Sequence, residues 1–297
     1  MLPAIASLFL RHRSPALQLA HRATVLATIV VALGTSSACS KESTSPAGNT
    51  RTYGPALALG QGTARTFVTT DQAGTPKTLG VALSEAAMTG LPQMPMPGMP
   101  SGAMLVLQLP AAAVNTGFDH VMLDWNPAGH EPEHVYTLPH FDFHFYQITS
   151  AVRESIMPTN PEWATKSGAF PTAEYIPAGY VAGSVLAGVP APAAAVPMMG
   201  MHWLDVASGE LQPPPNNKTF TSTFIYGTWD GTFIFLEPMI TKAYIESMKD
   251  KPAGIILPIG VAQKVQKAGA YPNAYSITYD ATAKEYRITL EGLATRQ

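Results

Sequence analysis

The run PHFDFHFY, residues 139–146, constrains the fold more than any other stretch of the chain. Aromatic and polar residues alternate along it, and a β-strand sends alternate side chains to opposite faces. The three phenylalanines are therefore expected to pack into a core on one face. The polar residues that share the other face are His140, Asp142 and His144. The run predicts a strand that is anchored by one face and presents two imidazoles and a carboxylate on the other.

The composition favours short strands joined by many turns. Charged residues make up 13% of the chain, which also has 27 Pro and 24 Gly, whereas typical soluble proteins have roughly 25% charged residues. Asp230-Gly231 lies between two aromatic-rich runs, which is a strong signal for a hairpin. We expect a mainly β fold: a β-sandwich or barrel-like sheets, with long Pro/Gly-rich loops and one or two short helices. The net charge of −2 gives no electrostatic footprint for nucleic acid, so no nucleic-acid partner is expected.

The N-terminus has the pattern of an export signal. A basic region, RHRSPALQLAHR, precedes an apolar core, ATVLATIVVALG, and the small residues of TSSAC follow. The only cysteine is Cys39, and its position predicts a lipoprotein signal over residues 1–38 with Cys39 as the lipidated residue. One departure is Ser36, which stands where the usual motif has Leu. The alternative is an ordinary cleavable signal with an incidental cysteine.

Either signal predicts an exported protein, and the lipid anchor predicts a membrane-attached one that faces the periplasm or the cell exterior. Residues 39–52 are rich in Ser, Thr and Lys and are expected to form a flexible tether. Residues 53–293 are expected to form a single β-rich domain, which can contain two sheets or subdomains divided near residues 150–200. With one cysteine the chain has no internal disulfide to stabilise it.

The histidines indicate a metal site. Four of the chain's 8 histidines lie within residues 125–146, and the shared face of His140 and His144 favours a bound divalent ion, with zinc preferred. His202 is expected to complete the site from a distant segment, and His130 from the turn-rich approach to the strand. His134 is left open, whereas His120 is interpreted as an ordinary core or surface residue.

Glu237 is the most informative carboxylate. Counting from the turn at Asp230-Gly231, Phe233, Phe235 and Glu237 are expected to share one face of a strand. A carboxylate among apolar neighbours is costly unless it is paired or bound to a metal. We therefore include Glu237 among the candidate ligands.

Three functions remain open at this stage. In a metal-dependent hydrolase, Glu237 or Asp142 would act as general base. In a non-catalytic module of the cell envelope, the metal or the histidine network would only join two sheets. In a periplasmic copper-handling protein, the ligands would include Met94, Met96 and Met99 of a Pro/Met/Gly loop. The sequence identifies neither a small-molecule substrate nor the metal.

Several runs together resemble a known family: WNPAGHEP, PHFDFHFY, MGMHWLD, YGTWDGTFIFLEPMIT and GTARTFVTTDQAGTPKTLGVALSEAAMTGLP. The family comprises uncharacterised bacterial secreted proteins and lipoproteins with a domain of unknown function, and includes a structurally known Thermus member controlled by a sigma factor. The resemblance spans most of residues 54–290 and, as mapped here, contains His130, His140, His144, His202 and Glu237. It implies a β-rich subunit and a homo-oligomer, and it brings no known reaction.

Lipidation at Cys39 can be tested by fractionating cells. Cys39→Ser removes the thiol that would carry the lipid, so the protein should move from the membrane to the soluble fraction. Ser43→Ala, a change within the expected tether, should leave the protein in the membrane fraction. An unchanged distribution of the Cys39→Ser protein on immunoblots would refute the anchor.

Overall fold

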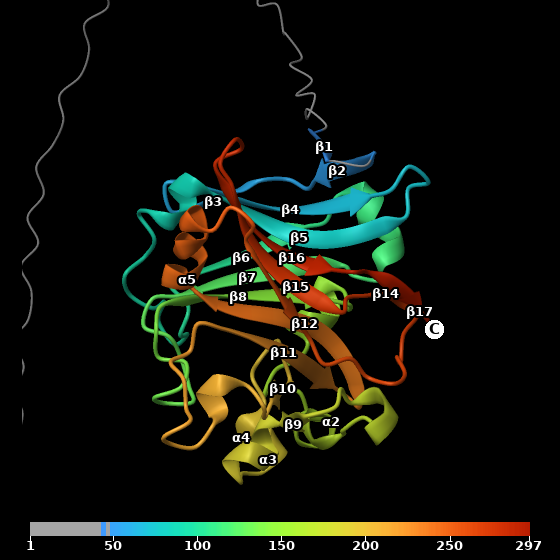
Figure 1. Ribbon diagram of the computed structural model, residues 1–297. Helices are drawn as coiled ribbons and strands as arrows, with labels where there is room; N and C mark the ends of the chain where they lie inside the picture. Colours follow the sequence, from blue (N-terminus) through green and yellow to red (C-terminus); the bar gives the residue numbers. More distant parts are fainter. Residues whose placement is uncertain (1–42, 46–47) are drawn as a thin grey trace, which may run out of the picture. The chain divides into compact units, whose positions relative to one another are not determined.

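The computed structural model describes residues 43–45 and 48–297. The predicted signal, Cys39 and the start of the predicted tether lie outside the described residues, so they stay predictions. These described residues belong to one compact unit. Two large antiparallel sheets and a two-stranded ribbon make up most of it (Figure 1). The prediction of a mainly β fold is confirmed.

The first sheet combines strands from the two ends of the chain. Its order is β1-β2-β4-β5-β16-β15-β13, with β3 also paired to β4. Its strands are β1 (Ser43–Ser45), β2 (Asn49–Tyr53), β3 (Leu57–Leu59), β4 (Gly62–Thr70), β5 (Pro76–Ser84), β13 (Ile255–Pro258), β15 (Ala274–Asp280) and β16 (Glu285–Glu291).

The second sheet comes from the middle of the chain, in the order β6-β7-β8-β12-β11-β10-β9. Its strands are β6 (Ala103–Gln108), β7 (His120–Asn126), β8 (His140–Tyr146), β9 (Tyr180–Ala182), β10 (Met201–Asp205), β11 (Ser222–Trp229) and β12 (Thr232–Thr241). The ribbon pairs β14 (Gly269–Tyr271) with β17 (Ala294–Arg296). The predicted hairpin at Asp230-Gly231 is confirmed as β11–β12, and both turn residues have positive φ.

The two large sheets pack face to face as a sandwich. The buried cluster between them contains Val81 of β5 and Ile288 of β16, together with the phenylalanines of β8. Phe141, Phe143 and Phe145 are each fully buried in it. The predicted division of β8 into a phenylalanine face and a polar face is therefore confirmed, because the phenylalanines fill the space between the sheets.

One predicted alternation was wrong. A β-bulge shifts the pairing of β11 with β12 between Gly227 and Thr228. Phe233 consequently packs against the core between the sheets, whereas Phe235 joins a cluster on the outer face of the second sheet. An extra residue in one strand reverses the alternation beyond it, so Phe233 does not share a face with Glu237.

Helices are short and more numerous than predicted. They are α1 (Ser150–Glu154), α2 (Trp163–Gly168), α3 (Gly183–Ala187), α4 (Ala191–Ala194), α5 (Lys242–Glu246) and the 3-10 turns η1 (Glu85–Met88), η2 (Ala111–Thr116), η3 (Ala173–Tyr175), η4 (Gly209–Leu211) and η5 (Ser247–Asp250). Thr149 and Thr241 cap α1 and α5 by accepting backbone N–H groups. Within the described ranges, no helix is long and apolar enough to cross a membrane.

Two expected boundaries differ from the structure. β2 already pairs with β4 before residue 53, because Thr50, Arg51 and Thr52 lie opposite residues of β4. A division near residues 150–200 also fails to separate the sheets. The reason is that β8, before this segment, pairs with β12 after it, so that both belong to one sheet.

The phenylalanine face of β8 gives a direct test of the core. Phe143→Ala should lower the free energy of unfolding by about 3–5 kcal/mol, because it leaves a cavity between the sheets. Val185→Ala, at a side chain that is 62% exposed, should change it by less than about 0.5 kcal/mol. Urea unfolding of both variants measures the difference, and equal effects would contradict the packing.

Candidate metal centre

The polar face of β8 is covered rather than open to solvent. His140, Asp142 and His144 are at most 5% exposed. On one side, Tyr136 and Phe220 form a cluster with residues of β10, β11 and β12. On the other side, residues of the 156–199 segment pack against residues of β7, β8 and β12. The loops after β7, β8 and β10 therefore enclose a polar interior beneath them.

His144, His202 and Glu237 form a first set of converging side chains, here called the Glu237 group. Each offers one ligand atom, and the three atoms lie within 4.8 Å of one another. The Glu237 carboxylate lies 3.3 Å from Nε2 of His144 and 3.7 Å from Nε2 of His202. The three residues come from β8, β10 and β12, so the strands of the sheet hold the group in place.

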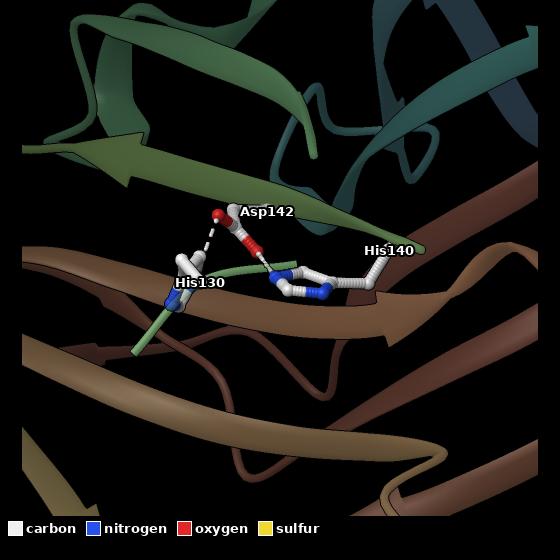
Figure 2. Close-up of side chains that lie close together, drawn as sticks. All are labelled: His130, His140 and Asp142. Carbon is white, nitrogen blue, oxygen red and sulfur yellow. Dashed lines mark ion pairs between the residues drawn. The ribbon is translucent and has the colours of Figure 1, made fainter. Parts of the chain in front are cut away.

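His130, His140 and Asp142 form a second set, here called the Asp142 group, whose ligand atoms also lie within 4.8 Å of one another. Figure 2 shows the Asp142 carboxylate between the two imidazoles. One carboxylate oxygen is 3.4 Å from Nε2 of His130, and the other is 3.2 Å from Nε2 of His140. His130 comes from the loop between β7 and β8, whereas the other two residues are on β8.

The strand register explains the Glu237 group. Glu237 pairs with Ile225 of β11, and His202 of β10 pairs with Gly227 of the same strand. A Cβ at position 227 would lie 1.9 Å from the Phe235 ring. Glycine is needed there because the aromatic ring lies over the strand, beside both imidazoles of the group.

The structure divides the ligand set that the sequence predicted for one ion. His144, His202 and Glu237 are brought together, whereas His130 and His140 converge on Asp142 instead. The strand rise accounts for the division. Four residues at roughly 3.3 Å each separate positions 140 and 144 by about 13 Å along β8. The two histidines therefore belong to neighbouring groups.

Polar atoms in both groups and in the neighbouring Asp124 are buried without a hydrogen-bond partner among the described residues. They are Nε2 of His140, Oδ1 of Asp142, both ring nitrogens of His144, Oε2 of Glu237 and both carboxylate oxygens of Asp124. Leaving one such atom unpaired typically costs about 1–3 kcal/mol, and more where it is charged. A shared cation would satisfy several of them at once.

The electrostatics of the groups favour a bound cation. Burial alone would lower the pKa of His130 and of His144, but nearby carboxylates outweigh it and raise each pKa to about 9. Burial raises the pKa of Glu237 to about 8, against the influence of His144. Burial and repulsion by His144 and His130 lower the pKa of His202 to about 3. His202 is thus neutral at physiological pH, which is the form that binds metals.

Two supporting residues were missed from the sequence. Asp124 of β7 lies 3.3 Å from Nδ1 of His144, and Asn126 donates a 2.6 Å hydrogen bond to Asp142. Carboxylates and amides of this kind orient metal ligands. The signal that could have found them is the alternation of β7, which places both residues on the same face as its cross-strand partners in β8.

Two other histidines lie outside both groups. The side chain of His134 is 88% exposed and its φ is 67°, which places it on the surface of the loop. His120 is fully buried, with Nδ1 2.8 Å from Asp119 and its ring stacked on Tyr146. The interpretation of His120 as a core residue agrees with this position.

Of the remaining predicted site residues, the two candidate general bases are buried and Met94 is exposed. Glu237 and Asp142, the candidate general bases, each lie within a ligand group. Burial acts to raise the pKa of Asp142, but the neighbouring imidazoles of His140 and His130 hold it well below its usual range. Met94 of the Pro/Met/Gly loop is 76% exposed, and its role in copper handling stays a prediction.

Fold and site together define a class: a β-sandwich with a covered histidine–carboxylate face on one sheet. Over residues 71–125 the chain is similar to a family described as TTHB210-like, hypothetical protein TTHB210. This supports a link to an uncharacterised Thermus-related family. The match covers β5 to β7 and includes Asp124, but it ends before His130. No curated protein and no solved structure matches the chain.

The metal-free protein should lose stability as the pH rises from about 6.5 to about 9. His130 and His144 have folded-state pKa values of about 9, above the ordinary 6.5. Their contribution to folding stability is therefore complete below pH 6.5 and is lost as the pH rises through about 9. The pKa of Glu237 is raised from 4.5 to about 8, which also makes stability fall up to pH 8.

Thermal melts of EDTA-treated protein at several pH values measure this trend. His134→Ala should keep the same slope, because its imidazole is exposed and outside both groups. A melting temperature that stays constant or rises between pH 6.5 and 9 would contradict the assigned electrostatics.

Proposed function

We propose that this protein binds a divalent metal ion, and that the ion is zinc held by His144, His202 and Glu237. The observation that carries the proposal is the convergence of these three ligand atoms within 4.8 Å, two of the residues being almost fully buried. Two imidazoles and one carboxylate are a common ligand set for zinc in proteins. Three strands supply the ligands, so little ordering is needed when the ion binds.

The surroundings of the Glu237 group support the same proposal. Asp124 lies 3.3 Å from Nδ1 of His144, so that Nε2 of this ring is directed at Glu237. A carboxylate behind a histidine fixes the ring and makes it a better ligand. A metal would also neutralise the Glu237 carboxylate, which burial otherwise keeps protonated up to about pH 8.

A role in hydrolysis is the further part of the proposal. The His202 side chain is 20% exposed and that of His130 is 26% exposed, so each group has one imidazole in contact with solvent. An imidazole–carboxylate site with an open position supplies Lewis-acid activation of water. A structural site in the envelope would have closed coordination instead. Azide should change the visible spectrum of the Co²⁺-loaded protein if the site is open, and leave it unchanged if it is closed.

We also propose that the protein acts in the cell envelope, attached through a lipid on Cys39. The support is the pattern of a basic region, an apolar core and small residues before this cysteine. In such a compartment the chain would meet metal ions from outside the cytoplasm.

Zinc binding can be tested with protein purified without a histidine tag and stripped with EDTA. Titration calorimetry should show tight zinc binding to the wild type, and Glu237→Gln should abolish or strongly weaken the Glu237-group site. Asp124→Asn should weaken it by about 10–100-fold, as expected for a residue that orients a ligand. His134→Ala is the matched control and should bind as the wild type does. Less than about 0.2 zinc per chain in the loaded wild type would overturn the proposal.

A further inference from the structure

We infer that the Asp142 group holds a second divalent ion, which makes the covered face of the second sheet a two-metal centre. This inference rests on the proposed function of the Glu237 group. It concerns a different set of residues, His130, His140 and Asp142, whose ligand atoms lie within 4.8 Å of one another.

The hydrogen bonds behind the two imidazoles determine which ring nitrogens are available. Nδ1 of His140 lies 2.6 Å from the Leu138 carbonyl, and Nδ1 of His130 lies 2.7 Å from the Glu131 carbonyl. A carbonyl oxygen only accepts hydrogen bonds, so both Nδ1 atoms carry the proton. In the neutral rings Nε2 therefore has a free lone pair, and both Nε2 atoms face the carboxylate of Asp142 (Figure 2).

Two lone pairs directed at an anionic carboxylate repel it, and a cation between them removes the repulsion. The alternative is that both rings are protonated and form ion pairs with Asp142. That would place two positive rings 4.7 Å apart, one of them fully buried, against a single carboxylate. The contact between His140 and Asp142 also lacks hydrogen-bond geometry, since Nε2 and Oδ1 are both without a partner. A metal fits these positions better than two protons.

The carboxylate of Asp142 is held in place from behind. Asn126 donates a 2.6 Å hydrogen bond to its Oδ2, and Ser101 donates a 3.1 Å hydrogen bond to the side-chain oxygen of Asn126. Both supporting residues are buried. A hydrogen-bonded carboxylate with two fixed imidazoles is the arrangement expected of a built metal site.

The two groups are close enough to form one centre. Asp142 and His144 are two residues apart on the same face of β8, which corresponds to about 7 Å along the strand. Met239, which is cross-strand from Asp142, lies two residues from Glu237 on β12. The interior also contains three buried carboxylates, Asp124, Asp142 and Glu237. When all are ionised they carry three negative charges, one more than a single divalent cation can neutralise.

The second ion would also connect a loop to the sheet. His130 belongs to the loop between β7 and β8, whereas His140 and Asp142 are on β8 itself. Binding at the Asp142 group should therefore reduce the motion of residues 127–139. This gives a measurement that is independent of counting metal ions.

The test uses the full mature chain, stripped with EDTA, loaded with excess Zn²⁺ and desalted before elemental analysis. The wild type and the His134→Ala control should retain about two zinc ions per chain, and His130→Ala and His202→Ala about one each. Hydrogen exchange of residues 127–139 should slow on zinc addition in the wild type and in His202→Ala. In the His130→Ala variant, zinc should leave the hydrogen exchange of residues 127–139 unchanged.

The outcomes separate the two proposals. One zinc per chain that is lost in His202→Ala but kept in His130→Ala would overturn the second site and leave the first standing. One zinc that is lost in His130→Ala but kept in His202→Ala would overturn the two-metal centre and the assignment of the first ion. No retained zinc in the folded wild type would refute both. Two zinc ions with no effect of zinc on exchange of residues 127–139 in any variant would overturn the assignment of the second ion to His130.

Discussion

The enclosure of acidic and imidazole side chains on one face of a sheet is the constraint on which the other features depend. Asp124, Asp142 and Glu237 are each at most 5% exposed. Removing a carboxylate from water costs on the order of several kcal/mol unless a partner compensates for it. Each of the three carboxylates has an imidazole nitrogen within 3.3 Å. Protons compensate only part of this cost, because several of the buried atoms form no hydrogen bond. The metal binding that we propose would resolve the remaining charge.

The other face of the same strand makes this enclosure possible. The phenylalanines of β8 fill the core between the two sheets, so the backbone of the strand is fixed before any ion binds. Gly227 allows the Phe235 ring to lie beside both imidazoles of the Glu237 group. The loops after β7, β8 and β10 then cover the polar face with their own aromatic residues. The core that stabilises the sheet thus lies on one of its faces, and the two histidine–carboxylate groups lie on the other.

Local patterns in the sequence predicted much of the fold. The alternation in residues 139–146 gave the two faces of β8, and Asp230-Gly231 gave the β11–β12 hairpin. The bulge in β12, opposite Gly227 and Thr228, was beyond such reasoning, because it depends on pairing with another strand. It reversed the predicted face of Phe233. The partition of the histidines into two groups was missed for a similar reason. It depends on which strands lie next to β8. The alternation of β7 places Asp124 and Asn126 on one face, but only the pairing of β7 with β8 shows that this face is the polar one.

Anomalous diffraction at the zinc absorption edge, from crystals of the zinc-loaded wild type, tests the central claim most directly. The account predicts a peak about 2.0–2.1 Å from Nε2 of His144 and of His202, and a second peak between Asp142 and the imidazoles of His130 and His140. A map with no peak on this face, in a crystal whose β8 and β12 are arranged as described, would contradict it. The histidine–carboxylate face would then be a network of ion pairs within the sheet.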